Sequence, residues 1–119
     1  MKNKPIIIIP GEINSIFFEI FFKILKKRSF KSPLILISSI EIFKTQAKRF
    51  KFKKKTRLIT LNNLNELKIN NNSINIIDIT KSKDYLEDCF DTAFKILKKG
   101  FTDKFINGPI DKTNFLKKK

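Results

Sequence analysis

The 119-residue sequence contains no histidine and no tryptophan, one cysteine and only three glycines. Without histidine, the chain has no imidazole that could act as a general base or bind a metal ion. With three scattered glycines, it contains neither a dinucleotide-binding Gly-x-Gly-x-x-Gly motif nor a phosphate-binding P-loop. The carboxylates follow no metal-ligand spacing. The sequence therefore shows no complete catalytic set, and we assign no catalytic residue and no metal ligand in it.

The single cysteine, Cys89, excludes an internal disulfide. It lies among apolar residues at helical spacing, which predicts a buried structural thiol rather than a nucleophile. No apolar run approaches the roughly 20 residues that a membrane-spanning helix requires. The run at residues 6–9 is also too short for the core of a signal peptide. We therefore expect a cytoplasmic protein with no membrane partner.

Acidic residues are scarce. The sequence has 26 Lys and Arg but only 11 Asp and Glu, which gives a formal net charge of +15. Residues 1–60 hold 15 basic and 3 acidic side chains, against 11 and 8 in residues 61–119. Such a polarised charge attracts nucleic acid or phosphorylated metabolites. However, only Arg28, Arg49 and Arg57 are arginines, whereas phosphate and base recognition favours arginine. Lys, Asn, Ile and Phe share AT-rich codons, so compositional drift is the preferred explanation and nucleic acid an unfavoured partner.

Alternating strands and helices are predicted along the chain. Continuous apolar, β-branched runs predict buried strands at residues 5–9, 33–37, 56–60, 73–79 and 104–106. Helical spacing predicts helices over residues 15–28, 39–50 and 84–98, the first capped by Asn14 or Ser15. The Asn-rich residues 61–73 predict an irregular connection. This order predicts a single α/β domain with a mostly parallel sheet and helices on both faces.

Two turns that follow predicted strands contain the candidate site residues. The first includes Gly11, Glu12 and Asn14, and the second runs from Asn107 to Lys112 and opens a final helix. Such turns open at the same edge of a parallel sheet, where α/β proteins bind their ligands. Lysine is unfavourable at the start of a helix, so Lys112 either serves an anionic ligand or is simply solvated. We expect one cleft to be shaped by Gly11, Glu12, Asn14, Gly108, Pro109 and Lys112.

The first turn resembles a motif of the 4-hydroxythreonine-4-phosphate dehydrogenase family, which acts in vitamin B6 biosynthesis. The family motif has the form Gly-Asp-Pro-Ala-Gly-Ile-Gly-Pro-Glu. Here Gly11, Ile16 and Glu19 match it, Glu12 replaces the aspartate, and Ser15 stands where the motif has a glycine. Phe17 stands at the position of another glycine, and Ile13 and Phe18 stand at the positions of the two prolines.

The second turn is similar to a more specific family motif, Thr-Ala/Gly-Pro-Ile-x-Lys. The corresponding stretch, Asn107-Gly108-Pro109-Ile110-Asp111-Lys112, differs from it only at the first position. The helix predicted just before this strand, with Lys99-Gly100 after it, also looks like the family's preceding element. The resemblance therefore covers nearly the whole chain.

The resemblance implies an isocitrate/isopropylmalate dehydrogenase-like fold and NAD-dependent oxidation of 4-phosphohydroxythreonine, followed by decarboxylation. The family's enzymes are longer homodimers, and their divalent metal is bound by histidines beyond the lysine motif. Residues 1–119 would then form the N-terminal α/β portion of such an oxidoreductase, truncated and inactive alone. NAD, the metal ion and the small phosphorylated substrate would belong to the full-length enzyme.

The alternative is a small basic α/β module that binds nucleic acid or phosphorylated metabolites. A final helix that ends at Lys119, with only Phe115 and Leu116 to bury, leaves the final strand's side of the sheet poorly covered. The sequence therefore also predicts exposed apolar surface.

Overall fold

The computed structural model describes residues 4–11, 16–64 and 68–108. In chain order the elements are β1 (Ile6–Ile9), α1 (Phe17–Lys27), β2 (Leu34–Ser38), α2 (Ile40–Arg49), β3 (Thr56–Ile59), the short 3-10 helix η1 (Leu61–Asn63), β4 (Ile74–Asp78), α3 (Tyr85–Lys98) and β5 (Lys104–Asn107). Each of these strands and α-helices lies within two residues of its predicted bounds. The predicted final helix lies outside the described residues.

The five strands form one sheet in the order β3-β4-β2-β1-β5, and every neighbouring pair is parallel. The chain moves from β1 to β2 and on to β3 at one edge, and it then returns to β4, between β3 and β2. From β4, α3 carries it across the sheet to β5 at the other edge. Both faces of the central strands are covered, which requires continuous apolar runs. Ile7, Ile9, Ile35 and Ile37 are accordingly inaccessible to solvent. The predicted α/β class and parallel sheet are confirmed.

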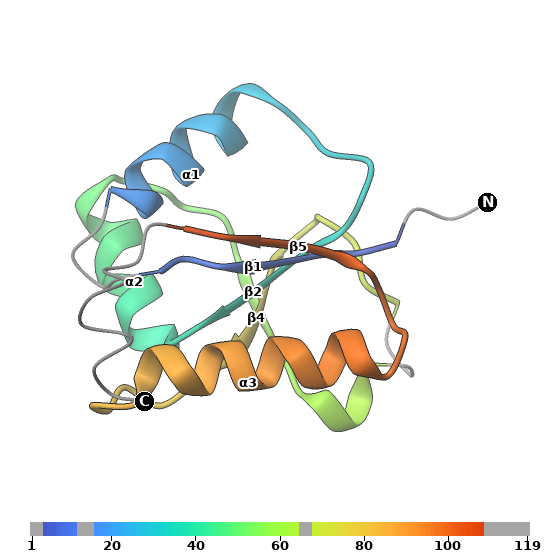
Figure 1. Cartoon of the computed structure of the whole chain (residues 1–119). Helices are drawn as coiled ribbons and strands as arrows, with labels where there is room; N and C mark the ends of the chain where they lie inside the picture. Colours follow the sequence, from blue (N-terminus) through green and yellow to red (C-terminus); the bar gives the residue numbers. More distant parts are fainter. Residues whose placement is uncertain (1–3, 12–15, 65–67, 109–119) are drawn as a thin grey trace.

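Helices cover both faces of this sheet: α1 and α2 lie on one side and α3 on the other (Figure 1). Aromatic rings fill the α1/α2 side, where Phe22 stacks on Phe52 with ring centroids 4.4 Å apart and meets Phe43 edge-on at 5.6 Å. On the opposite side, Cys89 and Ala93 of α3 are fully buried. The prediction of a buried structural thiol is therefore confirmed.

The start of α1 differs from the prediction. Ile16, rather than Asn14 or Ser15, takes the N-cap position, and its side chain makes no cap hydrogen bond. The predicted polar cap is therefore wrong. Glu19 in the first turn and Lys26 and Lys27 in the last turn still match the helix dipole.

In the connection before β4, which was predicted to be irregular, Asn71 is held by three side-chain hydrogen bonds. The Asn71 side-chain oxygen accepts a hydrogen bond from the Leu34 N–H at 2.8 Å. Its amide nitrogen donates to the carbonyl oxygens of Phe30 and Ser32 at 3.1 and 2.9 Å. One side chain thus fixes the chain entering β2.

Candidate functional site

The two predicted turns begin side by side at the carboxyl-terminal edge of the sheet. β1 and β5 are neighbours, with Ile9 paired to Asn107. The Gly108 N–H continues this pairing beyond the strands by donating a hydrogen bond to the Ile9 carbonyl oxygen at 2.7 Å. Gly11, two residues after Ile9, has φ +94°, a conformation that favours glycine. Gly11 and Gly108 therefore lie at the same edge, as a shared cleft requires.

Packing inside the protein explains why residue 108 is a glycine. A Cβ atom added to Gly108 would lie 2.7 Å from the carbonyl carbon of Pro10 and 2.9 Å from Cδ1 of Phe17, and it would overlap the Pro10 carbonyl oxygen. These separations are shorter than any ordinary van der Waals contact. Gly108 thus permits the close approach of the two turns to each other. This structural reason stands beside the ligand-binding reason that the motif suggests.

Four of the six predicted site residues lie outside the described residues, namely Glu12, Asn14, Pro109 and Lys112. Of the six, the structure therefore places only Gly11 and Gly108. The proximity of the other four to one another stays a prediction.

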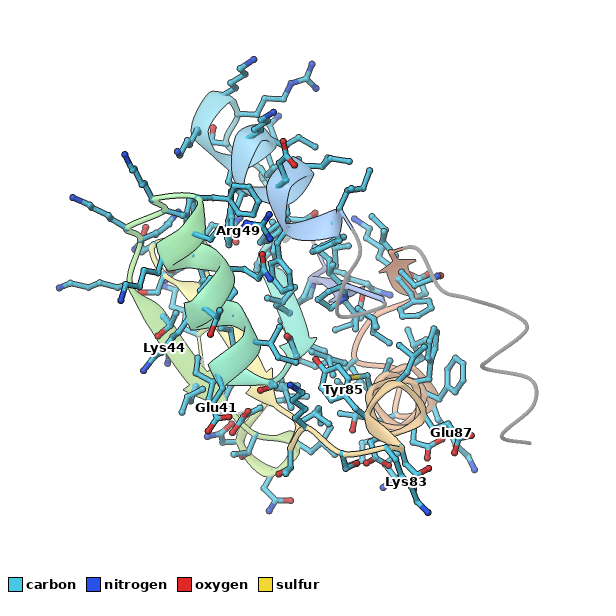
Figure 2. The ribbon with its side chains drawn as sticks, turned by 90° about the vertical axis from the view of Figure 1, so that its left-hand side faces the viewer. Glu41, Lys44, Arg49, Lys83, Tyr85 and Glu87 are labelled. Carbon is cyan, nitrogen blue, oxygen red and sulfur yellow. The ribbon has the colours of Figure 1, made fainter. Side chains whose placement is uncertain are left out.

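A second polar cluster lies at the same edge, between β2 and β4, and the sequence patterns did not identify it as a unit. The Tyr85 hydroxyl accepts a hydrogen bond from the Ser39 N–H at 2.9 Å and donates one to Ser38 Oγ at 3.1 Å. Asp78 Oδ1 accepts a hydrogen bond from the Ile40 N–H at 2.8 Å. In Figure 2, Tyr85 points from α3 toward the interior and α2, whereas Lys83 and Glu87 point outward.

This cluster uses the polar groups at the start of α2 for internal contacts. Besides the Asp78 bond, Ser39 Oγ accepts a hydrogen bond from the Ile42 N–H at 3.3 Å. Ser38 and Ser39 are both buried. Because these N–H groups are satisfied within the protein, the start of α2 is organised for stability rather than for anion binding.

Burial raises the pKa values of Tyr85 and Cys89. Removal from water raises the pKa of Tyr85 from 10.0 to about 12, with a further rise from nearby Cys89 and an opposing effect of the Ser38 hydrogen bond. Burial likewise raises the pKa of the Cys89 thiol from 9.0 to about 12. A thiol in this state is a poor nucleophile. Neither group is therefore prepared for acid–base chemistry near neutral pH.

The described residues do not form a metal site. Among them, no three His, Cys, Asp or Glu side chains gather closely enough to hold a metal ion. No metal-dependent step is therefore assigned to these residues. Within the same part of the chain, no helix combines the length and apolar character needed to cross a bilayer.

Comparison with known proteins identifies the fold. The sequence matches no protein-family model and no curated protein at a significant level. The structure, however, is similar to that of a 4-hydroxythreonine-4-phosphate dehydrogenase from Burkholderia phymatum, with a TM-score of 0.79 and 16% sequence identity over 98% of this chain. The chain shares the fold of a part of that enzyme. The dehydrogenase from Klebsiella pneumoniae is similar at a TM-score of 0.71 and 15% identity, again over 98% of this chain.

The chain spans 39% of the length of each of these two dehydrogenases. The resemblance predicted from the two turns is therefore confirmed at the level of the fold, over a part of the dehydrogenase structure. The similarity of the folded chain extends well beyond the short motifs.

Proposed function

We propose that this chain is the N-terminal portion of a 4-hydroxythreonine-4-phosphate dehydrogenase and forms one side of its substrate cleft. The complete enzyme would oxidise the secondary alcohol of 4-phosphohydroxythreonine with NAD as hydride acceptor, and decarboxylation of the 3-keto acid would follow. This reaction belongs to pyridoxal phosphate biosynthesis in the cytoplasm. The observation that carries the proposal is the adjacency of Gly11 and Gly108, whose turns resemble the family's motifs, on a sheet with the dehydrogenase fold.

The proposed roles follow the two turns. Gly11, Glu12 and Asn14 would line the cleft from the first turn, and Gly108 and Pro109 from the second. Lys112 would meet the anionic group of the phosphorylated substrate, because a lysine charge near a helix start is otherwise unfavourable. NAD, the divalent metal and the homodimer contacts would come with the part of the enzyme that this chain does not span.

An activity assay tests whether the chain is catalytically incomplete. Purified chain mixed with 4-phosphohydroxythreonine, NAD and a divalent metal should form no NADH, because its sequence lacks the histidines that would hold the metal. The Klebsiella pneumoniae dehydrogenase serves as the positive control under the same conditions. Steady formation of NADH by this chain alone would contradict the proposal that it needs the rest of the enzyme.

Calorimetry with the same substrate tests whether the chain contributes to the cleft. The substrate should bind, and Lys112→Ala should weaken binding about 10-fold, the effect of one lost charge-assisted contact. Lys104→Ala is the matched control, because Lys104 is exposed at the other end of β5. Absence of binding, or equal losses in the two variants, would count against the proposed site.

A further inference from the structure

An apolar groove with a volume of about 340 Å³ lies between α1 and the edge strand β5. Every side chain that lines it is apolar, including Ile8 of β1, Ile106 of β5 and a row of isoleucines on α1. Five of these side chains are exposed to solvent: Ile16 (63%), Ile20 (47%), Ile24 (42%), Phe30 (38%) and Ile106 (53%). A contiguous apolar surface of this kind indicates a binding site more often than isolated exposed residues do.

The shape of the groove fits a helix. Ile16, Ile20 and Ile24 are spaced four residues apart, so they form a single ridge along α1. Ridges of this spacing are the surfaces through which two helices pack. Beside the ridge, Ile106 lies on the α1 side of β5, next to Ile8 in the register of the sheet. A helix placed alongside α1 would cover both surfaces at once.

Positive charge borders the groove at the C-terminal end of α1. Lys23, Lys27 and Arg28 line an adjoining depression together with Ile24 and Phe30. Lys23 pairs with Glu19 at 3.1 Å. Among the described residues, Lys27 and Arg28 have no carboxylate within ion-pair distance. The border of the groove is therefore complementary to an acidic partner.

We propose that this groove binds an amphipathic helix of another polypeptide. The apolar face of that helix would lie against the Ile16–Ile20–Ile24 ridge, and its acidic residues would face Lys27 and Arg28. A second copy of this chain is a poorer occupant, because it carries the same cations and a net charge of +15. A bilayer surface is also a poorer occupant, because only an inserted row of side chains fills a concave groove. The proposal concerns the surface alone and is independent of the proposed dehydrogenase activity.

Two designed peptides test the chemistry of the occupant. Each is a labelled helix of about 18 residues with leucines at i, i+4 spacing, and the flanking positions are Glu in one and Lys in the other. Fluorescence anisotropy with the intact chain should show about 10-fold tighter binding of the Glu peptide, with an advantage that shrinks as salt increases. Equal affinity for the two peptides, or no binding of either, would overturn the proposal.

Matched variants test the location. Ile20→Ser and Ile106→Ser should each weaken Glu-peptide binding about 10-fold, the effect of removing one buried aliphatic side chain from a contact. Leu58→Ser is the control, because Leu58 is 57% exposed on β3 at the opposite edge of the sheet. Equal losses in all three variants would refute the assignment. The assignment would also be refuted if sedimentation showed a dimer that Ile106→Ser abolishes. Binding to vesicles of anionic lipid that Ile106→Ser abolishes would refute it as well.

Discussion

Tyr85 connects segments that are far apart in the sequence but adjacent at the carboxyl-terminal edge of the sheet. Its hydroxyl bonds to residues 46 and 47 positions earlier, Ser39 and Ser38, and so ties α3 to the turn between β2 and α2. Helical spacing predicts that Tyr85 lies on the buried face of α3. Helical spacing does not indicate which groups the Tyr85 hydroxyl contacts, because those contacts depend on α3 packing over β2. The residue could be predicted to be buried, but its hydrogen bonds could not.

Asn71 shows the same limit for the Asn-rich connection. Composition alone suggested codon drift and an irregular segment, yet this one amide makes three hydrogen bonds that hold the entry to β2. A local pattern cannot distinguish this asparagine from Asn72 beside it, which is exposed. Its role depends on contacts with residues about 40 positions away.

The raised pKa values of Tyr85 and Cys89 predict a loss of stability at alkaline pH. In the unfolded chain these groups lose their protons near pH 10 and 9, but in the folded chain only near pH 12. Between these limits the unfolded state binds fewer protons, so the free energy of unfolding falls as pH rises. Each group lowers it by about 1.36 kcal/mol per pH unit within its window. Below about pH 8 the titration of these two groups no longer changes the free energy of unfolding. Urea unfolding over a pH series measures this slope.

Tyr85→Phe separates the two contributions. The variant should keep the Cys89 part of the slope and lose the tyrosine part above pH 10. It should also be less stable at neutral pH by about 1–3 kcal/mol, because the buried Ser39 N–H loses its acceptor. Tyr85 is the only tyrosine, so tyrosinate absorbance reports on this group alone. Identical slopes for the variant and the wild type would show that the hydroxyl is not protected by the fold.

At the scale of elements, the strands and helices follow closely from apolar periodicity, because each buries a face of fixed spacing. The placement of β5 beside β1 does not follow from periodicity. It depends on the long crossover through α3 and on the contact between Gly108 and the β1 turn. The common edge of the two turns could be predicted because parallel strands share their carboxyl ends. Their direct contact could not.

Gly108→Ala should loosen the join between β1 and β5. The added methyl group would collide with the Pro10 backbone and Phe17, so we expect a loss of about 1–3 kcal/mol, typical of an overpacked site. Hydrogen exchange should become faster at the Ile106, Asn107 and Gly108 amides. The amides of β2 and β4 should exchange as before.

Gly100→Ala is the matched control for this substitution. Gly100 has φ +77° and nothing within 4 Å of an added Cβ, so its cost, about 1–2 kcal/mol, comes from backbone conformation alone. It should leave exchange at the β1–β5 join unchanged. The same local acceleration in both variants would contradict the role given to Gly108.

At the scale of the molecule, the chain has the fold of a part of a 4-hydroxythreonine-4-phosphate dehydrogenase, with both candidate turns at one edge of its sheet. The uncovered groove beside β5 agrees with the expectation of exposed apolar surface. The sequence predicted this surface on the final strand's side of the sheet, and Ile106 of β5, the final strand, is 53% exposed there. It did not predict that α1 forms the other wall of the groove, because that depends on how α1 packs against the sheet. The proposed cleft and the apolar groove use different chemistry, and they can be tested separately.

The three glycines allow a direct test of the proposed cleft by amide NMR. Gly11 and Gly108 lie at the carboxyl-terminal ends of the strands. Gly100 follows α3 and precedes β5, so it lies near the amino-terminal ends of the strands. Titration with 4-phosphohydroxythreonine should shift the amide signals of Gly11 and Gly108 and leave that of Gly100 in place. Unchanged Gly11 and Gly108 signals at saturating ligand, or equal shifts of all three glycines, would contradict the claim that these two turns form the substrate cleft.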